Sequence, residues 1–224
     1  MDALKNVFKR SKTKQQPSIF RKSKAEKGIL QKGCLDLHTA LKNTYDTREN
    51  QSKYGKDCGY DYDPELSNDN QQIYYNKDKK TLMMSVAGTH NASDIGTDLK
   101  MMVSKGGVKQ TDRYREAEMT LGKAKAKYNP ATTTGIGHSL GGTIISNLDG
   151  IDKKTTYNKA HMNPFTKTPG NETAVRSYGD AVSFLSRGNK HTHNIAGGSI
   201  TDPYTWLKAH NTDNLKKYGY KVPE

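Results

Sequence analysis

The chain has 224 residues, a formal net charge of +13 and a hydrophobic content of 32%. This length fits one ordinary domain and is short for two, and the low apolar content raises the question of disorder. The apolar residues are, however, concentrated in residues 82–108, 136–151 and 175–185. We therefore expect one folded core with poorly ordered flanks.

Positive charge is concentrated at the start of the chain. Residues 1–33 contain ten Lys or Arg and two acidic residues, giving a net charge of +8, and the rest of the chain carries +5. Such an excess is typical of a segment that binds a polyanion, either nucleic acid or an anionic membrane surface, although a solvated tail has the same composition. We interpret residues 1–28 as a flexible basic arm and residues 29–224 as the folded domain.

The first predicted elements are a short helix and a pair of strands. Apolar residues on one side indicate a short helix over residues 35–41. Residues 73–75 and 81–87 read as strands joined by a polar turn over 76–79. The second strand is nearly continuously apolar, so we expect it to be buried on both faces.

Two helices are predicted next. The first runs from a Ser93 cap to the Gly106-Gly107 pair, with apolar residues at helical spacing. The second begins at Thr111 or Asp112, carries one apolar stripe, and ends at Tyr128 before a proline.

The remainder alternates between strands and helices. The β-branched segment 132–136 predicts a strand, and residues 140–148 predict a helix directly after it. Residues 155–157 and 174–178 are further strand candidates, and residues 204–217 are expected to be partly helical. This alternation is typical of the α/β class, with a mostly parallel central sheet flanked by helices.

A short motif joins the strand predicted at 132–136 to its helix. Gly137-His138-Ser139-Leu140-Gly141 fits G-x-S-x-G, in which the serine occupies a strained strand-to-helix turn and the glycines let the chain fold back. The five residues alone are a weak signal, but the strand before them and the helix after them are what the motif requires. Ser139 is therefore the candidate nucleophile, the alternative being a serine in an ordinary glycine-rich turn.

Acyl transfer by a serine also needs a histidine to take its proton and a carboxylate to orient that histidine. In this architecture the acid follows the serine and the histidine comes last. Asp180 follows the strand predicted at 174–178, at the strand end where ligand sites of open α/β sheets lie. Asp149 and Asp152 lie beyond the far end of the serine's helix, so Asp180 is the candidate acid, with a turn aspartate as the alternative.

Three histidines follow the candidate acid: His191, His193 and His210. We favour His210 as the base because a polar, glycine-rich stretch precedes it and can loop it back over the sheet. His193 stays open as the alternative. His138 is adjacent to the serine and unsuited to curl back onto it, and His161 precedes the acid and breaks the expected order.

The tetrahedral intermediate requires hydrogen-bond donors aimed at its oxyanion. One donor is expected from the backbone N–H of Leu140, the residue after the nucleophile. The other is expected from the loop after the buried strand, at Thr89 in Gly88-Thr89-His90, where the threonine hydroxyl could contribute as well.

Together these residues resemble the class 3 lipases, also called fungal-type triacylglycerol lipases, of the α/β-hydrolase superfamily. Four segments carry the resemblance, and they are similar to the family's elbow, oxyanion segment, triad aspartate and late histidine. The segments are Gly137-His138-Ser139-Leu140-Gly141-Gly142, Gly88-Thr89-His90-Asn91-Ala92-Ser93-Asp94 followed by Thr97-Asp98-Leu99, Ser177-Tyr178-Gly179-Asp180-Ala181-Val182, and Ala209-His210-Asn211. They occur in the family's order over residues 71–215.

Three positions depart from the family's usual pattern. Ala87 stands where the family has Arg before the Gly-Thr pair, Ile95 replaces a common aromatic residue, and Asn163-Pro164-Phe165 matches only loosely. These changes leave the local ion pairing open, and also whether residues 96–107 form a mobile lid. A lipase-like core without an export signal suggests a divergent, viral member.

The start of the chain and its two cysteines bear on location. The basic start lacks the apolar stretch of a secretory signal, and no apolar run approaches the ~18–20 residues that span a bilayer. Cys34 and Cys58 are too few for a disulfide framework and have no histidine cluster beside them, so we expect no metal and no other cofactor. They suit a reducing compartment, although one disulfide between them stays open. The sequence thus predicts an intracellular location, with a virion as an alternative.

The resemblance implies a serine ester hydrolase, lipase- or phospholipase-like, that cleaves lipid acyl esters through an acyl-enzyme on Ser139, with His210 and Asp180. An alternative of another class is a lipase-fold structural or virion protein whose basic arm binds nucleic acid. The arm could instead hold a lipase on an anionic membrane. The sequence fixes neither the head group nor the acyl chain of the substrate.

Overall fold

The computed structural model describes residues 34–90, 107–160, 168–180, 182–183, 191–198 and 203–224. The arm predicted over residues 1–28, the helix predicted after Ser93, and His161 lie outside these residues. So does nearly all of the segment 96–107 for which a lid was left open.

The described residues form a seven-stranded sheet in the order β1-β2-β3-β4-β5-β6-β7. The strands are β1 (Asp61–Tyr62), β2 (Gln71–Asn76), β3 (Thr81–Val86), β4 (Thr132–His138), β5 (Lys153–Tyr157), β6 (Glu172–Ser177) and β7 (Thr192–Ile195). Strands β1 to β3 pair antiparallel, and β3 to β7 pair parallel. The predicted mostly parallel central sheet is confirmed.

The helices are α1 (Leu37–Asn43), α2 (Arg48–Lys53), α4 (Asp112–Tyr128), α5 (Ser139–Asn147) and α6 (Pro203–His210), with short 3-10 turns η2 (Lys56–Cys58), η4 (Val108–Gln110) and η5 (Thr212–Leu215). Helix α4 begins where Thr111 accepts a hydrogen bond from the Tyr114 N–H. It ends at Tyr128, and the next residue, Asn129, has a left-handed φ of 43°.

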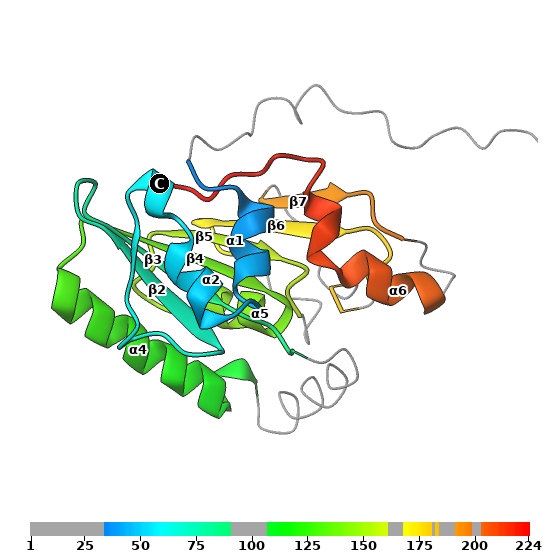
Figure 1. Ribbon diagram of the computed structural model, residues 1–224. Coiled ribbons are helices and arrows are strands. Elements are labelled where there is room, and N and C mark those ends of the chain that lie inside the picture. The colour runs from blue at the N-terminus through cyan, green and yellow to red at the C-terminus, as the bar shows by residue number, and fades with distance from the viewer. Residues whose placement is uncertain (1–33, 91–106, 161–167, 181, 184–190, 199–202) are drawn as a thin grey trace, which may run out of the picture. The chain divides into compact units, whose positions relative to one another are not determined.

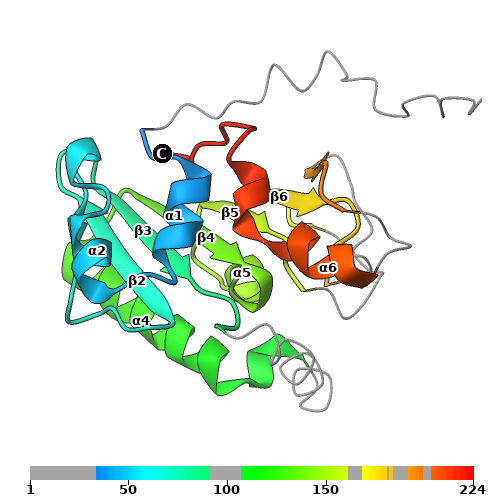
Figure 2. The ribbon, with the colours of Figure 1, turned by 45° about the vertical axis from the view of Figure 1, so that its right-hand side comes forward.

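Each face of the sheet has its own apolar core, because successive strand residues point to opposite faces. Leu82 and Met84 of β3 pack with α4 and α5 on one face. Met83, between them in sequence, packs on the other face with Leu37 and Leu41 of α1. Figures 1 and 2 show α1 and α4 on opposite sides of the strands. The burial of β3 on both faces, predicted from its apolar run, is confirmed.

Residues 204–217, expected to be partly helical, form two separate helical pieces. Helix α6 ends at His210, and η5 starts at Thr212. Asn211 separates them, and its side-chain oxygen accepts the Asp213 N–H at 2.8 Å. This local cap competes with a continuous helix.

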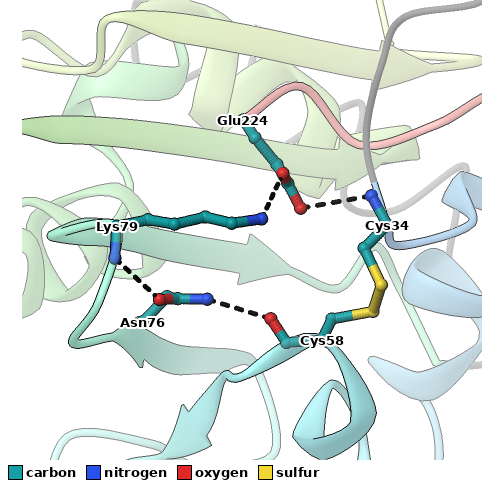
Figure 3. Close-up of a disulfide and its surroundings, with 5 residues drawn as sticks. All are labelled: Cys34, Cys58, Asn76, Lys79 and Glu224. Atoms are coloured by element: carbon teal, nitrogen blue, oxygen red, sulfur yellow. Dashed lines mark hydrogen bonds and ion pairs between the residues drawn. A yellow bond between two sulfur atoms is a disulfide. The ribbon is translucent and has the colours of Figure 1, made fainter.

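A disulfide joins Cys34 to Cys58, with 5.8 Å between the two Cα atoms. Figure 3 shows that the Glu224 carboxylate lies beside it, accepting the Cys34 N–H at 3.1 Å and pairing with Lys79 Nζ at 2.5 Å. Of the two cysteine states left open by the sequence, the structure has the disulfide. Within the described part of the chain, no helix is both long and apolar enough to cross a membrane.

Candidate active site

The turn between β4 and α5 places Ser139 in a backbone conformation that non-glycine residues rarely adopt. Its φ is 54°, in the left-handed region. The glycines on either side are required by close backbone approaches. A Cβ added to Gly137 would lie 2.4 Å from the Gly141 oxygen, and one added to Gly141 would lie 2.1 Å from the Val86 oxygen. The strained strand-to-helix turn that the motif predicts is therefore present at Ser139.

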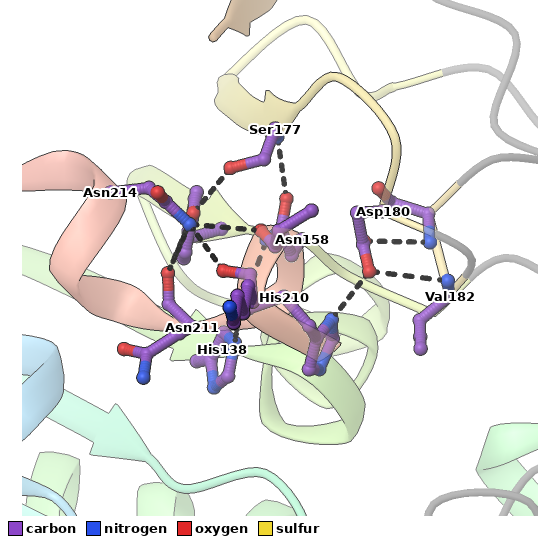
Figure 4. Close-up of polar contacts among 12 residues, drawn as sticks. His138, Asn158, Ser177, Asp180, Val182, His210, Asn211 and Asn214 are labelled. Carbon is purple, nitrogen blue, oxygen red and sulfur yellow. Dashed lines mark hydrogen bonds and ion pairs between the residues drawn. The ribbon is translucent and has the colours of Figure 1, made fainter. Parts of the chain in front are cut away.

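His210 and Asp180 form a buried pair. His210 Nδ1 lies 2.8 Å from Asp180 Oδ1, and the two residues are 6% and 2% exposed (Figure 4). The carboxylate also accepts backbone N–H groups from Val182 and Ser183. Burial opposes ionisation of this carboxyl, but the hydrogen bonds from His210 and Ser183 outweigh it and hold the pKa of Asp180 below its usual value.

The pairing fixes the role of each His210 nitrogen. An ionised carboxylate only accepts hydrogen bonds, so the Nδ1 of His210 carries a proton, and in the neutral ring the lone pair is on Nε2. Among the described residues, this buried Nε2 has no hydrogen-bond partner. In the neutral ring this nitrogen can accept a proton, as a general base must.

His138 connects the serine turn to His210. Its Nε2 lies 2.9 Å from the His210 carbonyl oxygen, and its ring centroid is 4.7 Å from that of His210. Its Nδ1 lies 2.7 Å from the Tyr45 hydroxyl. Because a carbonyl only accepts, Nε2 donates and Nδ1 accepts from Tyr45. Burial lowers the pKa of His138 to about 3, so the ring is neutral and both of its nitrogens are occupied.

Ser139 thus lies next to the residue that holds the His210 backbone, and it is 3% exposed. The structure has no hydrogen bond between Ser139 Oγ and His210 Nε2, since that nitrogen is unpartnered among the described residues. In unliganded sites such bonds are often long and tighten only with substrate.

The other sequence candidates lie elsewhere. His193 is on β7, with its ring centroid 6.0 Å from that of Tyr220, and the carboxylate of Asp180 is occupied by His210. Asp152 accepts the Thr133 N–H near the start of β4, at the opposite end of that strand from Ser139. Asp149 is exposed, 3.9 Å from Lys109.

The loop after β3, which contains Thr89, passes directly beside the serine. A Cβ added to Gly88 would lie 2.8 Å from the Ser139 Cβ and 2.9 Å from the His138 oxygen. The Tyr45 hydroxyl accepts the Gly88 N–H at 2.7 Å. Burial raises the pKa of Tyr45 to about 12, so this hydroxyl stays protonated and can also donate to His138.

Arg113, in the first turn of α4, donates to two carbonyls of the same loop. Its guanidinium nitrogens lie 2.7 Å from the Ala87 oxygen and 3.2 Å from the Gly88 oxygen. Sequence reasoning missed both Arg113 and Tyr45. The sequence contains one indirect signal. Ala87 stands where the class 3 lipases have Arg, which left open how this loop is paired.

No family model and no curated protein matches the chain. Solved structures similar to it include the Lip2 lipase from Yarrowia lipolytica, with a TM-score of 0.42 and 15% identity over 66% of this chain and 69% of that one. A triacylglycerol lipase from Penicillium expansum has a TM-score of 0.39 and 15% identity over 84% and 90% of the two chains. A CIB-like hydrolase, so predicted, from Thermoplasma acidophilum has a TM-score of 0.35 and 13% identity over 66% and 87%. Likenesses this weak leave the chemistry to be judged from the site itself.

Proposed function

We propose that the protein is a serine carboxylic-ester hydrolase. One observation carries the proposal: the strained turn at Ser139 lies beside a buried His210–Asp180 pair whose free ring nitrogen has no partner among the described residues. A serine in an ordinary glycine-rich turn would need neither a left-handed backbone conformation nor a neighbouring histidine oriented by a carboxylate.

The proposed reaction proceeds through an acyl-enzyme. Ser139 Oγ attacks the ester carbonyl carbon while its proton passes to His210 Nε2, and Asp180 stabilises the resulting imidazolium. Backbone N–H groups of Leu140 and Thr89 stabilise the oxyanion. His210 then protonates the leaving alcohol, and a water molecule activated by the same nitrogen releases the acid.

The substrate class we propose is a lipid acyl ester. It rests on the four sequence segments that resemble class 3 lipases, including the motif around Ser139. The departures at Ala87 and Ile95 lie in the oxyanion segment and leave the proposed serine, histidine and aspartate in place.

Hydrolysis of p-nitrophenyl esters and of phospholipid vesicles by the purified full-length protein tests this function, with Ser139→Ala as the matched control. We expect release of acid by the wild type alone, and a fluorophosphonate adduct mapped to Ser139 by mass spectrometry. Equal activity of the two proteins would remove the assignment.

A second candidate function is favoured by the charge of the first 33 residues, which carry +8. We propose that the basic arm binds an anionic surface, either a membrane that presents the lipid substrate or nucleic acid in a structural role. Vesicle binding and DNA binding compared at equal salt separate these partners.

A further inference from the structure

The loop that precedes Thr89 is held by two side chains from distant parts of the chain. Arg113 comes from α4 and Tyr45 from the segment between α1 and α2. Arg113 donates to the carbonyls of Ala87 and Gly88, and Tyr45 accepts the Gly88 N–H. We propose that Arg113 and Tyr45 are positioning residues that aim the Thr89 N–H at the oxyanion. This inference rests on the proposed ester hydrolysis.

The argument begins with the peptide between Gly88 and Thr89. A trans peptide is planar, so its C=O and N–H point in opposite directions. Arg113 holds the Gly88 oxygen at 3.2 Å. The direction of the Thr89 N–H, on the other side of the same plane, is therefore set by Arg113.

The preceding peptide is held at both of its ends. The Ala87 oxygen accepts from Arg113 at 2.7 Å, and the Gly88 N–H donates to Tyr45 at 2.7 Å. Two successive peptide planes are thus fixed by three hydrogen bonds. Because one guanidinium spans both carbonyls, a rotation of either plane breaks at least one of these contacts.

Gly88 needs this external support. The absence of a Cβ at this position leaves room for Ser139, because a Cβ added to Gly88 would lie only 2.8 Å from the Ser139 Cβ. A glycine has more backbone freedom than any other residue, so the loop cannot fix its own conformation at this point. Contacts from Arg113 and Tyr45 supply the restraint that a side chain would normally provide.

Tyr45 also sets the spacing between the two proposed oxyanion donors. Its hydroxyl accepts from the Gly88 N–H and donates to His138 Nδ1, each at 2.7 Å. His138 precedes Ser139 and Leu140, so one hydroxyl joins the Thr89 loop to the turn that carries Leu140. Oxyanion stabilisation requires donors within a narrow range of distances from one oxygen.

The test compares Arg113→Ala, Arg113→Lys and Tyr45→Phe with two matched controls. Arg115→Ala removes a neighbouring guanidinium that pairs with exposed Asp112 at 3.2 Å. Tyr128→Phe removes a half-buried hydroxyl that donates to Asp63 at 2.7 Å, remote from the site. The readouts are kcat and KM on p-nitrophenyl butyrate, and the inhibition constant of an alkyl boronic acid.

We expect Arg113→Ala and Tyr45→Phe to lower kcat roughly 10- to 100-fold, less than or equal to the loss of one oxyanion donor, with KM changed by less than about threefold. The boronic acid forms a tetrahedral adduct whose oxygen occupies the oxyanion position, so its inhibition constant should rise by a similar factor. Arg113→Lys, which can hold one carbonyl, should fall between Arg113→Ala and the wild type. The two controls should match the wild type.

Rates are normalised to the number of serines labelled by a fluorophosphonate at completion, which removes any loss of folded protein. Normalised kcat and inhibition constants within about twofold of the wild type would overturn the inference and leave Arg113 and Tyr45 with a structural role. If Arg113→Ala does not fold, Arg113→Lys and Tyr45→Phe decide the question. A wild type that neither labels nor hydrolyses esters contradicts the proposed function instead, so the two failures are distinguishable.

Discussion

His138 and His210 have ring centroids 4.7 Å apart, but their hydrogen bonds suit them to different tasks. Both nitrogens of His138 are engaged, by Tyr45 and by the His210 carbonyl. His210 uses one nitrogen on Asp180, and its other nitrogen has no partner in the described part of the chain. The neighbouring histidine therefore positions the backbone, while His210 is available for proton transfer.

Asp180→Asn tests the orientation of His210. An amide in place of the carboxylate can donate to Nδ1, which favours the tautomer with the proton on Nε2 and removes the base. We expect kcat to fall roughly 10³- to 10⁴-fold with little change in circular dichroism. Asp152→Asn, at the other end of β4, is the control and should retain wild-type activity. A loss below tenfold for Asp180→Asn would contradict the assigned role.

His138 should make the folded protein sensitive to acid. The unfolded chain binds this proton below about pH 6.5, whereas the folded protein binds it only near pH 3. The free energy of unfolding therefore falls as the pH drops from 6.5 towards 3, by up to about 1.4 kcal/mol per pH unit from this group. Urea unfolding at several pH values measures the slope, and His138→Gln should make it shallower. An unchanged slope in that variant would show that His138 is not the source.

The sequence identified the side chains proposed for the chemistry but not those that hold the backbone around them. Ser139, Asp180 and His210 follow from a local motif, a strand end and the order of the residues. Tyr45 lies 43 positions from the Gly88 N–H that it binds, and Arg113 lies 26 positions from the Ala87 oxygen. Backbone atoms are the same in every residue, so contacts to them leave no pattern of residue types to read.

At the scale of elements, the break between α6 and η5 has a direct effect on the site. The last carbonyls of a helix have no partner within it. His210 is the last residue of α6, and its carbonyl accepts from His138 and from Asn158. A helix continuing without a break to residue 217 would have engaged this carbonyl internally and removed the contact with His138.

Strand prediction succeeded where burial was strong and failed at the edges. Strand β3 has buried apolar residues throughout and was predicted. Strand β7 (Thr192–Ile195) is largely polar and lies at the edge of the sheet, and β1 has only two residues. An edge strand packs against fewer neighbours than a central strand and needs fewer apolar residues. Its sequence therefore resembles that of a loop.

Helix α5 is anchored to the sheet by a buried ion pair. Lys159 Nζ lies 2.6 Å from Glu172 Oε1, and Ser146 of α5 donates to the same carboxylate at 2.6 Å. Burial lowers the pKa of Lys159, although Glu172 opposes this effect. The cluster fixes the end of α5 opposite Ser139.

Glu172→Gln should destabilise the protein by about 3–5 kcal/mol, because it leaves the Lys159 charge buried without its counter-charge. Glu49→Gln is the matched control, since Glu49 pairs with Lys53 on the surface of α2 and should cost less than about 0.5 kcal/mol. Urea denaturation monitored by circular dichroism gives both values. Equal stabilities for the two variants would contradict the anchoring role of Glu172.

At the scale of the whole molecule, the uneven charge predicts how salt affects binding. Each phosphate neutralised by the arm contributes about 0.9 to the log–log slope of affinity against salt on duplex DNA. Deleting residues 1–28 should therefore flatten the salt dependence of binding to DNA or to anionic vesicles, whichever the full chain prefers. Sedimentation of vesicles and fluorescence anisotropy with DNA, each from low to moderate salt, measure the two slopes. A slope unaffected by the deletion would remove the arm as the binding segment.

The disulfide between Cys34 and Cys58 closes a covalent loop at the point where the basic segment enters the domain. Both α1 and α2 lie inside this loop, and so does Tyr45. Tension applied to the N-terminal segment, for instance by a surface to which it adheres, would be shared between the sulfur bridge and the hydrogen bonds that Leu35 and Leu37 make with the C-terminal segment. Both anchors precede Tyr45 in the chain or bypass it, so they would limit the load that reaches the hydroxyl bound to the Gly88 N–H.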